Sequence, residues 1–269
     1  MIIGHTLMGK GENHVIVLHG WFGDHGTFAP TFDSLDTDTF TYAFVDYRGY
    51  GKSREIAGHH TMEEIAGDVI DLAEELGWHE FHLVGHSMGG MAAMRILMDI
   101  NDPGRIDSIV AIAPVPPCGV PLDEANTELF YGAIKHDGNR RNILDFTTGH
   151  RNSGIWLDHM VRCSRETTTE AAYADYLTAW TKTDFADAIK GKTTPVCVCI
   201  GEHDPAFTEA AMKQTYLAWL PNVEFKCIAN AGHYPMLETP VQLATIMEDF
   251  IKQHCTEESI RPVEQHAYA

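Results

Sequence analysis

The stretch FHLVGHSMGGMAAMRIL, residues 81–97, joins a continuous apolar run to a pattern with helical spacing through a glycine-rich turn. A short apolar run of this kind is typical of a strand that is covered on both faces of a parallel sheet. Gly85 and Gly89 let the chain turn sharply, and Ser87 lies between them. The stretch therefore predicts a strand, a tight turn and a helix, with an exposed serine hydroxyl at the edge of a sheet.

The same alternation of apolar runs and helical patterns extends outward from this turn in both directions. One helical pattern begins at Thr61, where T-x-x-E makes a capping box with Glu64, and stops at Gly77. Another pattern, ATIMEDFIKQHC, closes the fold near residue 255. The further strand candidates are residues 14–20, 41–47, 106–114, 195–201 and 223–229. This order predicts an α/β fold with a mostly parallel central sheet and helices on both faces.

One segment interrupts the alternation. Between Pro114 and Pro195 there is no convincing strand. Helices are expected instead around residues 125–135, 140–147, 153–164 and 169–180. Such an insertion indicates a helical cap over the carboxyl edge of the sheet. The predicted division is a first part of the core (1–117), a cap (118–184), a second part of the core (185–255) and a polar C-terminal tail (256–269).

Length and composition limit the class of protein. The 269 residues suffice for one large domain with an inserted subdomain. No apolar run approaches the ~20 residues that span a bilayer. The chain has 38 acidic and 19 basic residues, which gives a formal net charge of -19. Nucleic acid and anionic membranes would repel such a chain, so neither is expected as a partner.

The cysteines and the opening residues bear on the compartment. The six cysteines have neither disulfide nor zinc spacing, and MIIGHTLMGKGENH lacks the features of a secretory signal. Cys197 and Cys199 form C-x-C inside an apolar strand candidate, which favours buried free thiols over metal ligands. We therefore expect a reducing, cytoplasmic location.

Residues 85–89 fit G-x-S-x-G directly after a strand and before a helix, the context in which the serine is a nucleophile. The alternative is a glycine-rich turn that is structural or binds phosphate. No Lys or second hydroxyl follows, as a phosphate-binding loop would require. A serine hydroxyl needs a histidine base that a carboxylate holds in the correct tautomer.

Position selects the base and the acid among sixteen histidines and many carboxylates. His233 follows the last strand candidate, and Asp204 follows the strand candidate before it. Carboxyl ends of parallel strands share one edge of a sheet, and Ser, Asp, His is the chain order expected of this fold. Either residue alone also fits an ordinary turn; with Ser87 they predict a triad. Glu202 is an alternative acid, but Asp204 lies farther along the loop.

Acyl transfer also needs backbone N–H groups that face the developing oxyanion. Met88 follows the serine, and Trp21 lies in HGWFG (19–23) after an early strand candidate. An ordinary glycine turn with a packed aromatic ring is the alternative for Trp21. We interpret His19 and His86 as structural. The aromatic residues predicted to contact substrate are Trp21, Phe22, Phe130, Trp156 and Trp180. No residue set has metal-site spacing here, so no metal is expected.

Five ordered motifs resemble those of the α/β-hydrolase superfamily, in its small lidded branch of serine esterases. They are HGWFG (19–23), VDYRGYGKS (45–53), GHSMGG (85–90), GEHDP (201–205) and AGHYPMLETP (231–240). The resemblance covers residues 13 to 255 and implies a Ser87 nucleophile, an Asp204 acid, a His233 base and oxyanion amides at Trp21 and Met88. It implies no cofactor and no chemical role for Arg48. The short N-terminus is a departure that leaves room for only a reduced first hairpin.

The resemblance also implies the reaction. A serine at position 87 disfavours epoxide hydrolases and haloalkane dehalogenases, which are similar but use an aspartate. A carboxylesterase is therefore expected, acting on a small-molecule ester with a small to medium acyl chain through an acyl-enzyme, as a monomer or homodimer. A carbon–carbon bond hydrolase, a lactonase or a perhydrolase would use the same triad. A slow-turnover ligand receptor of this fold, or a cofactor-free oxygenase, would show the same motifs.

Overall fold

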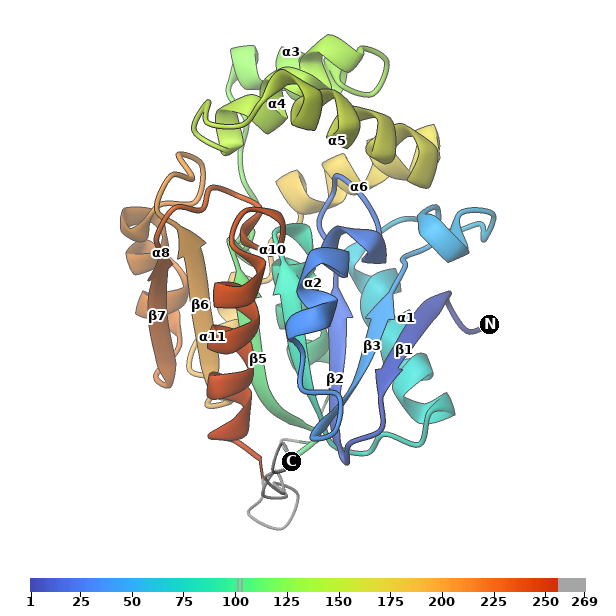
Figure 1. The fold of residues 1–269 in the computed structure, drawn as a ribbon, viewed down its shortest axis with the longest axis vertical. Helices are drawn as coiled ribbons and strands as arrows, with labels where there is room; N and C mark the ends of the chain where they lie inside the picture. The colour runs from blue at the N-terminus through green and yellow to red at the C-terminus, as the bar shows by residue number, and fades with distance from the viewer. Residues whose placement is uncertain (101, 103, 256–269) are drawn as a thin grey trace, which may run out of the picture.

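Seven strands form one twisted sheet at the centre of the molecule, in the order β1-β3-β2-β4-β5-β6-β7 (Figure 1). The computed structural model describes residues 1–100, 102 and 104–255, so the tail predicted at 256–269 lies outside the described residues. The strands are β1 (His5–Gly9), β2 (Asn13–Leu18), β3 (Phe40–Val45), β4 (Phe81–His86), β5 (Ile106–Ile112), β6 (Val196–Gly201) and β7 (Val223–Ile228). All six predicted strands are present, and they pair in parallel as expected.

The edge strand β1 differs from the prediction. It follows the antiparallel register His5↔Val45 to Gly9↔Thr41 on β3, so consecutive strands β1 and β2 are not paired with each other. The expected reduced first hairpin is therefore wrong. The strand HTLMG is half-buried or exposed along its length and has no continuous apolar run. An edge strand of this kind lacks the signal that marks the buried strands.

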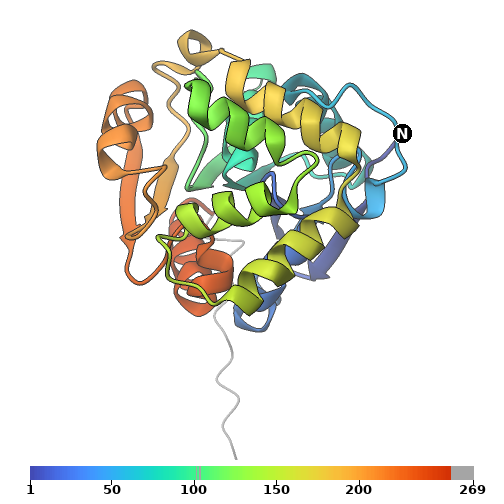
Figure 2. The ribbon, with the colours of Figure 1, turned by 90° about the horizontal axis from the view of Figure 1, so that it is seen from above.

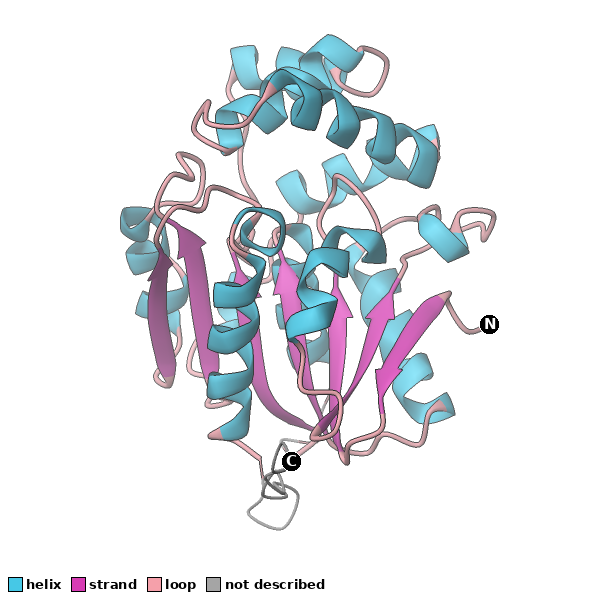
Figure 3. Ribbon diagram, in the orientation of Figure 1, coloured by secondary structure: helices cyan, strands magenta, loops and turns pink. Residues whose placement is uncertain are grey.

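Helices cover both faces of the sheet (Figures 1 and 3). The 3-10 helix η1 (His25–Ser34) packs with α11 (Pro240–Lys252) on one face, and α1 (Met62–Glu75) packs with α2 (Met88–Asp99) on the other. The remaining elements of the core are η2 (Gly51–Ser53), α8 (Glu209–Gln214), α9 (Tyr216–Trp219) and α10 (Pro235–Glu238). Because both faces are covered, Val15, Ile16 and Val17 in succession are almost fully buried. This explains the continuous apolar runs of the central strands.

Helix α1 begins as predicted, with one change in the capping box. The Thr61 hydroxyl accepts a hydrogen bond from the Glu64 N–H at 3.1 Å. The Glu64 carboxylate does not return to Thr61; it accepts the N–H groups of His59 and His60 at 3.0 and 2.8 Å. The box therefore fastens the preceding loop as well as the first turn of the helix.

The inserted segment between β5 and β6 is helical, as predicted (Figure 2). It comprises α3 (Glu124–Gly132), α4 (Asp137–Thr147), α5 (Gly154–Thr167), α6 (Glu170–Lys182) and the short α7 (Ala186–Ile189). The first four lie over the carboxyl edge of the sheet, and we call α3 to α6 the cap. Asp123, Ser153 and Thr169 cap α3, α5 and α6 with their side chains, which explains where these helices begin.

The cap is tied to loops of the core at a few backbone contacts. Thr168 forms an isolated bridge with Tyr50, and the Thr169 N–H donates to the Gly49 carbonyl at 2.9 Å. At the other side, the His233 N–H donates to the Thr147 carbonyl at 3.1 Å. Within the described residues, no helix has both the length and the apolar character needed to cross a membrane.

Candidate active site

Ser87 occupies a strained turn between β4 and α2. Its φ of 54° and ψ of -116° are unusual for a residue with a side chain. The Ser87 N–H donates to the Ile112 carbonyl at 2.8 Å, and the Ser87 carbonyl accepts the N–H of Val115 at 3.0 Å. A Cβ on Gly85 would lie 2.3 Å from the Gly89 carbonyl oxygen. The close approach predicted for the glycines is therefore present, and it holds the serine at the edge of the sheet.

Three loops at this edge bring Ser87, His233 and Asp204 into one hydrogen-bonded line. His233 Nε2 lies 3.0 Å from Ser87 Oγ, and His233 Nδ1 lies 2.7 Å from Asp204 Oδ2. The loops follow β4, β7 and β6 in turn. All three residues are less than 9% exposed. When Nδ1 donates its proton to the carboxylate, Nε2 is left to accept a proton from the serine hydroxyl.

The acid is oriented by its own loop. Asp204 Oδ1 accepts the N–H groups of Ala206 and Phe207 at 2.8 and 3.2 Å, which leaves Oδ2 for the imidazole. Glu202, the alternative acid, accepts the Asn230 N–H at 3.1 Å instead. The geometry thus favours Asp204 over Glu202 as the partner of His233.

His86 supports the loop that carries His233. Its Nε2 lies 2.8 Å from the His233 carbonyl oxygen, and the two rings are 4.9 Å apart between centroids. Burial is the main cause that lowers the pKa of His86 well below its ordinary value, and the nearby His233 is the second. A neutral imidazole can donate this hydrogen bond, so His86 holds the backbone of the His233 loop, as its interpretation as a structural residue requires.

The two predicted oxyanion amides belong to residues near the serine: Met88 follows it in the chain, and a Cβ added to Gly20, the neighbour of Trp21, would lie 3.3 Å from Ser87 Cβ. Met88 is the first residue of α2, where N–H groups have no partner within the helix. Among the described residues, neither the Met88 nor the Trp21 N–H donates to another protein group. Trp21 is held by its other groups: Tyr50 Oη donates to its carbonyl at 2.9 Å, and its Nε1 donates to the Tyr173 carbonyl at 2.8 Å.

A cavity of about 270 Å³ opens beside Ser87 and His233, under the cap. Of the aromatic residues predicted to contact substrate, Trp21, Phe22, Phe130 and Trp180 line it. Trp156 does not; its ring lies edge-on to Tyr234, 6.2 Å away. Trp156 thus contacts a residue that lines the cavity without lining it itself, a difference that its aromatic character in the sequence does not reveal.

Other lining residues were not predicted from the sequence: Val115, Pro116, Gly119, Val120, Pro121, Leu122, Ile143, Thr147, Ala206, Ala211, Met212, Thr215 and Tyr234, besides His86 and Phe207. Several follow strand ends directly, and Phe207 stacks on the His233 ring with centroids 5.3 Å apart. The lining residues that follow β5, β6 and β7 could have been identified in the sequence from their place just after strand candidates. None of the described residues that line the cavity is Lys, Arg, Asp or Glu.

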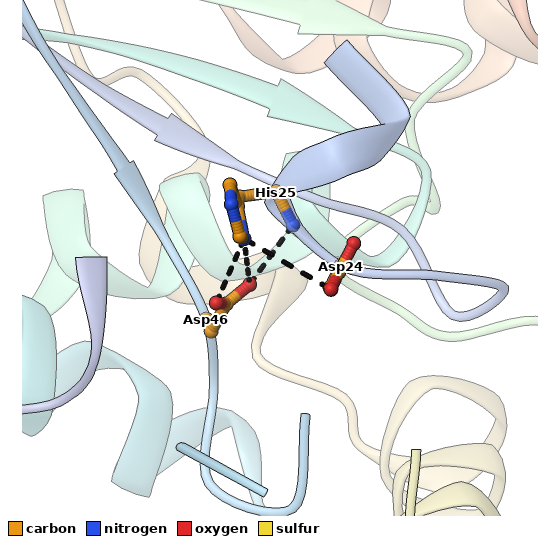
Figure 4. A group of neighbouring side chains, drawn as sticks. All are labelled: Asp24, His25 and Asp46. Carbon is orange, nitrogen blue, oxygen red and sulfur yellow. Dashed lines mark hydrogen bonds and ion pairs between the residues drawn. The ribbon is translucent and has the colours of Figure 1, made fainter. Parts of the chain in front are cut away.

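Asp24, His25 and Asp46 form a second cluster of ionisable residues (Figure 4). None of the three lines the cavity. The buried Asp46 carboxylate accepts the backbone N–H groups of His25 and Lys52, each at 2.9 Å, and His25 Nδ1 at 2.8 Å. The hydrogen bond to Asp46 raises the pKa of His25 above its ordinary value. The carboxylate is thus engaged in fastening two loops, in keeping with a packing role for the motif at 45–53.

Comparison with known proteins agrees with the fold. A stretch of 107 residues is 34% identical to the dihydrolipoyllysine-residue acetyltransferase component of the acetoin cleaving system of Cupriavidus necator, covering 40% of this chain and only 28% of that protein. The non-heme chloroperoxidase of Burkholderia pyrrocinia is 29% identical over 70% of this chain and 73% of its own. The esterase EaEST of Exiguobacterium antarcticum superposes with a TM-score of 0.83 at 18% identity, over 93% of this chain and 95% of that chain.

The match to a protein family covers much more of the chain than the 107 residues shared with the first of these relatives. Residues 15–246 match the Alpha/beta hydrolase family, a span that contains the loops of Trp21, Ser87, Asp204 and His233 and the whole cap. With this match over most of its length, the chain belongs to the alpha/beta hydrolase family.

Proposed function

We propose that the protein is a serine hydrolase that cleaves carboxylic esters of small to medium acyl chain length through an acyl-enzyme on Ser87. One observation carries this proposal: the hydrogen-bonded line from Asp204 through His233 to Ser87 ends at an uncharged cavity. An esterase is also among the solved structures of this fold described above. That likeness supports the fold, and the chemistry rests on the site.

In the proposed mechanism, His233 Nε2 takes the Ser87 proton as Oγ attacks the ester carbonyl. The N–H groups of Trp21 and Met88 stabilise the negative oxygen of the tetrahedral intermediate. His233 then gives its proton to the departing alcohol, and the acyl group stays on Ser87. Water, deprotonated by His233, attacks the acyl-enzyme and releases the acid and the free serine. Asp204 stabilises the imidazolium during both steps.

The cavity supports the substrate class. Its volume of about 270 Å³ lies just below the ~300–1,000 Å³ that ligand pockets span, which favours a small to medium acyl group. A substrate carboxylate placed inside would be buried without a Lys or Arg partner among the described lining residues. Because burying an unpaired charge is costly, neutral esters are favoured over charged ones.

A perhydrolase that forms a peracid from a carboxylic acid and hydrogen peroxide is the second candidate. The observation in its favour is the similarity to a non-heme chloroperoxidase over 70% of this chain. A carbon–carbon bond hydrolase or a lactonase would use the same triad, but no further observation favours either. Steady-state kcat on p-nitrophenyl esters, a lactone, a diketone and an acid with peroxide separates these reactions.

The test of the proposal combines turnover with labelling. Wild-type protein is assayed with p-nitrophenyl acetate, butyrate and octanoate and then treated with a fluorophosphonate, with Ser87→Ala as the matched variant. We expect turnover of the shorter esters and a label on Ser87 only. A label on another residue, or an active Ser87→Ala, would refute the mechanism. Labelling with less than about one turnover per hour would favour the slow receptor over an enzyme with an ordinary kcat.

We further propose that the protein works on a small-molecule ester in the cytoplasm as a monomer or homodimer, without nucleic acid or membrane partners. The net charge of -19 supports the absence of anionic partners. The six cysteines, all free thiols in the structure, support a reducing compartment. Size-exclusion chromatography with light scattering would decide between the two assembly states.

A further inference from the structure

Arg140, near the start of α4, is buried inside the cap with only 1% of its surface exposed. Its Nε donates to the Ala133 carbonyl at 2.8 Å, and its Nη1 donates to Ser164 Oγ at 2.7 Å. It makes no ion pair with a described carboxylate. Burial lowers the pKa of Arg140 below its ordinary value. A buried charge without a counterion is costly, so its position calls for an explanation.

The Tyr173 ring is a third partner of this charge, besides the Ala133 carbonyl and the Ser164 hydroxyl. The guanidinium carbon lies 3.7 Å from the centroid of the Tyr173 ring. The Trp21 indole stacks on the same ring, with centroids 4.0 Å apart and planes inclined by 20°. Two groups this close to one ring must occupy its opposite faces. Tyr173 is therefore held between a buried cation from α4 and an indole from the core, and such a cation–π contact is strongest where water is excluded.

Trp21 is held in part by Tyr173 and in part by the hydrogen bond from Tyr50 Oη to its carbonyl. It lies in a loop after β2, outside any regular element, so no helix or strand ladder holds its amide. Its indole N–H donates to the Tyr173 carbonyl, in addition to the stacking. Both the ring and the backbone of Tyr173 thus locate the residue whose N–H is proposed to face the oxyanion. An oxyanion donor acts only when it is placed within a few tenths of an ångström.

Helix α4 reaches the catalytic base at its other end. The Thr147 carbonyl, in its last turn, accepts the His233 N–H at 3.1 Å. A Cβ added to Gly232 would lie 2.7 Å from Thr148 Cα, so the base loop and the end of α4 are in close contact. Arg140 therefore belongs to a helix that contacts the base loop directly and the oxyanion loop through Tyr173.

We propose that Arg140 is a positioning residue, through which the cap holds the Trp21 amide in place for catalysis. The proposal rests on the serine-hydrolase function proposed above. On this reading the cap is a fixed part of the catalytic scaffold, and the buried charge is retained because it clamps Tyr173 against Trp21.

The test compares two adjacent arginines on α4. Arg140→Met removes the buried charge and keeps an unbranched side chain of moderate length. Arg141→Met is the matched control, because the Arg141 side chain is 41% exposed and pairs with the exposed Asp158 at 3.0 Å. We expect kcat for p-nitrophenyl butyrate to fall about tenfold in Arg140→Met, a part of the ~10²–10³ lost when one oxyanion donor is removed. KM should change less than twofold, and Arg140→Lys should restore part of the loss.

A tetrahedral inhibitor separates positioning from general loosening of the fold. An alkyl boronic acid bonds to Ser87 Oγ and presents an oxygen to the amides, so its inhibition constant should rise about tenfold in Arg140→Met. Melting temperatures are recorded for every variant, and assays are run well below them. A purely structural role would lower the melting temperature while leaving kcat and boronate affinity unchanged, which would overturn the proposal.

A double-mutant cycle locates the effect. Tyr173→Leu should lower kcat as Arg140→Met does, and adding Arg140→Met to it should cost little more, because the ring that transmits the effect is absent. Tyr173→Phe keeps the ring and should restore kcat relative to Tyr173→Leu. Additive losses would overturn the clamp. If wild type hydrolyses no ester and Ser87 takes no label, the proposed function itself fails; equal kcat for Arg140→Met and Arg141→Met in an active, labelled enzyme refutes the clamp alone.

Discussion

Two histidine–aspartate pairs among the described residues have buried carboxylates and are nearly alike at the carboxylate. His233 Nδ1 lies 2.7 Å from Asp204, and His25 Nδ1 lies 2.8 Å from Asp46. Both carboxylates also accept two backbone N–H groups. The pairs differ at the other nitrogen of the ring. His233 Nε2 meets Ser87 Oγ beside the cavity, whereas His25 Nε2 has no partner among the described residues.

The difference shows that a histidine–aspartate pair is not a catalytic device by itself. In both places the carboxylate orients an imidazole. Only at the edge beside the cavity does the second nitrogen face a nucleophile and space for a substrate. At the other place the pair joins the start of η1 to the loop after β3, and we expect it to contribute to stability. Variants at matched positions of the two pairs can break or sharpen this contrast.

The largest contrast is expected between the two histidines. His233→Ala should lower kcat by ~10³- to 10⁶-fold, because the serine loses its base. His25→Ala should leave kcat within about twofold of wild type, since among the described residues His25 neither lines the cavity nor forms a hydrogen bond with the three residues in line. Steady-state kinetics with p-nitrophenyl butyrate measure both. Near-native turnover by His233→Ala would place the base elsewhere and remove the contrast.

Substitution of the two aspartates by asparagine should give opposite patterns. Asp204→Asn should reduce kcat by about 10⁴-fold, since the amide favours the wrong imidazole tautomer. Asp46→Asn should keep kcat and lower the free energy of unfolding by about 2–3 kcal/mol, because its amide group cannot accept all three N–H groups. Urea unfolding and kinetics are recorded on the same samples. A loss of activity in stable Asp46→Asn would mean that the two pairs are functionally coupled.

The pH dependence of stability should identify the His25–Asp46 pair. The hydrogen bond to Asp46 raises the pKa of His25 in the folded protein above the ordinary value near 6.5. A histidine whose pKa is raised by folding contributes its full stabilisation at pH values below its ordinary pKa. The contribution is lost as the pH rises through the raised pKa of the folded protein. His25→Gln should therefore cost about 1 kcal/mol more at pH 6 than at pH 9. An equal cost at both pH values in denaturant titrations would contradict the charged pair.

The smallest expected effect is the change in melting temperature when a metal ion is added. Asp24, His25 and Asp46 lie close enough together to suggest a cation site, but Asp46 already accepts three hydrogen bonds. A cation bound to these three side chains would have to displace the hydrogen bond between His25 Nδ1 and Asp46. We expect millimolar Zn²⁺ to raise the melting temperature by less than about 1 °C. A larger rise that is absent from His25→Gln would show that the pair is a metal site.

Much of the site was predictable because its residues follow strand ends. The turn at Ser87 and the loops of Asp204 and His233 each come directly after an apolar run, and the structure brings these three side chains together as expected. Two features were not predictable in the same way. Edge strand β1 has only a weak local pattern, and Trp156 has the same aromatic character as Trp180 but does not line the cavity.

The sequence by itself determined the order of the elements, the edge of the sheet that carries the site and the identity of the three residues in line, because these depend on local patterns and on where strands end. Tertiary structure alone decided which side chains line the cavity and how the cap contacts the loop of Trp21. The physical reason is distance along the chain: Trp21 bonds to Tyr173 across 152 positions and packs, through it, against the buried Arg140. No local pattern encodes a contact of that separation, since only the packed cap brings these groups together.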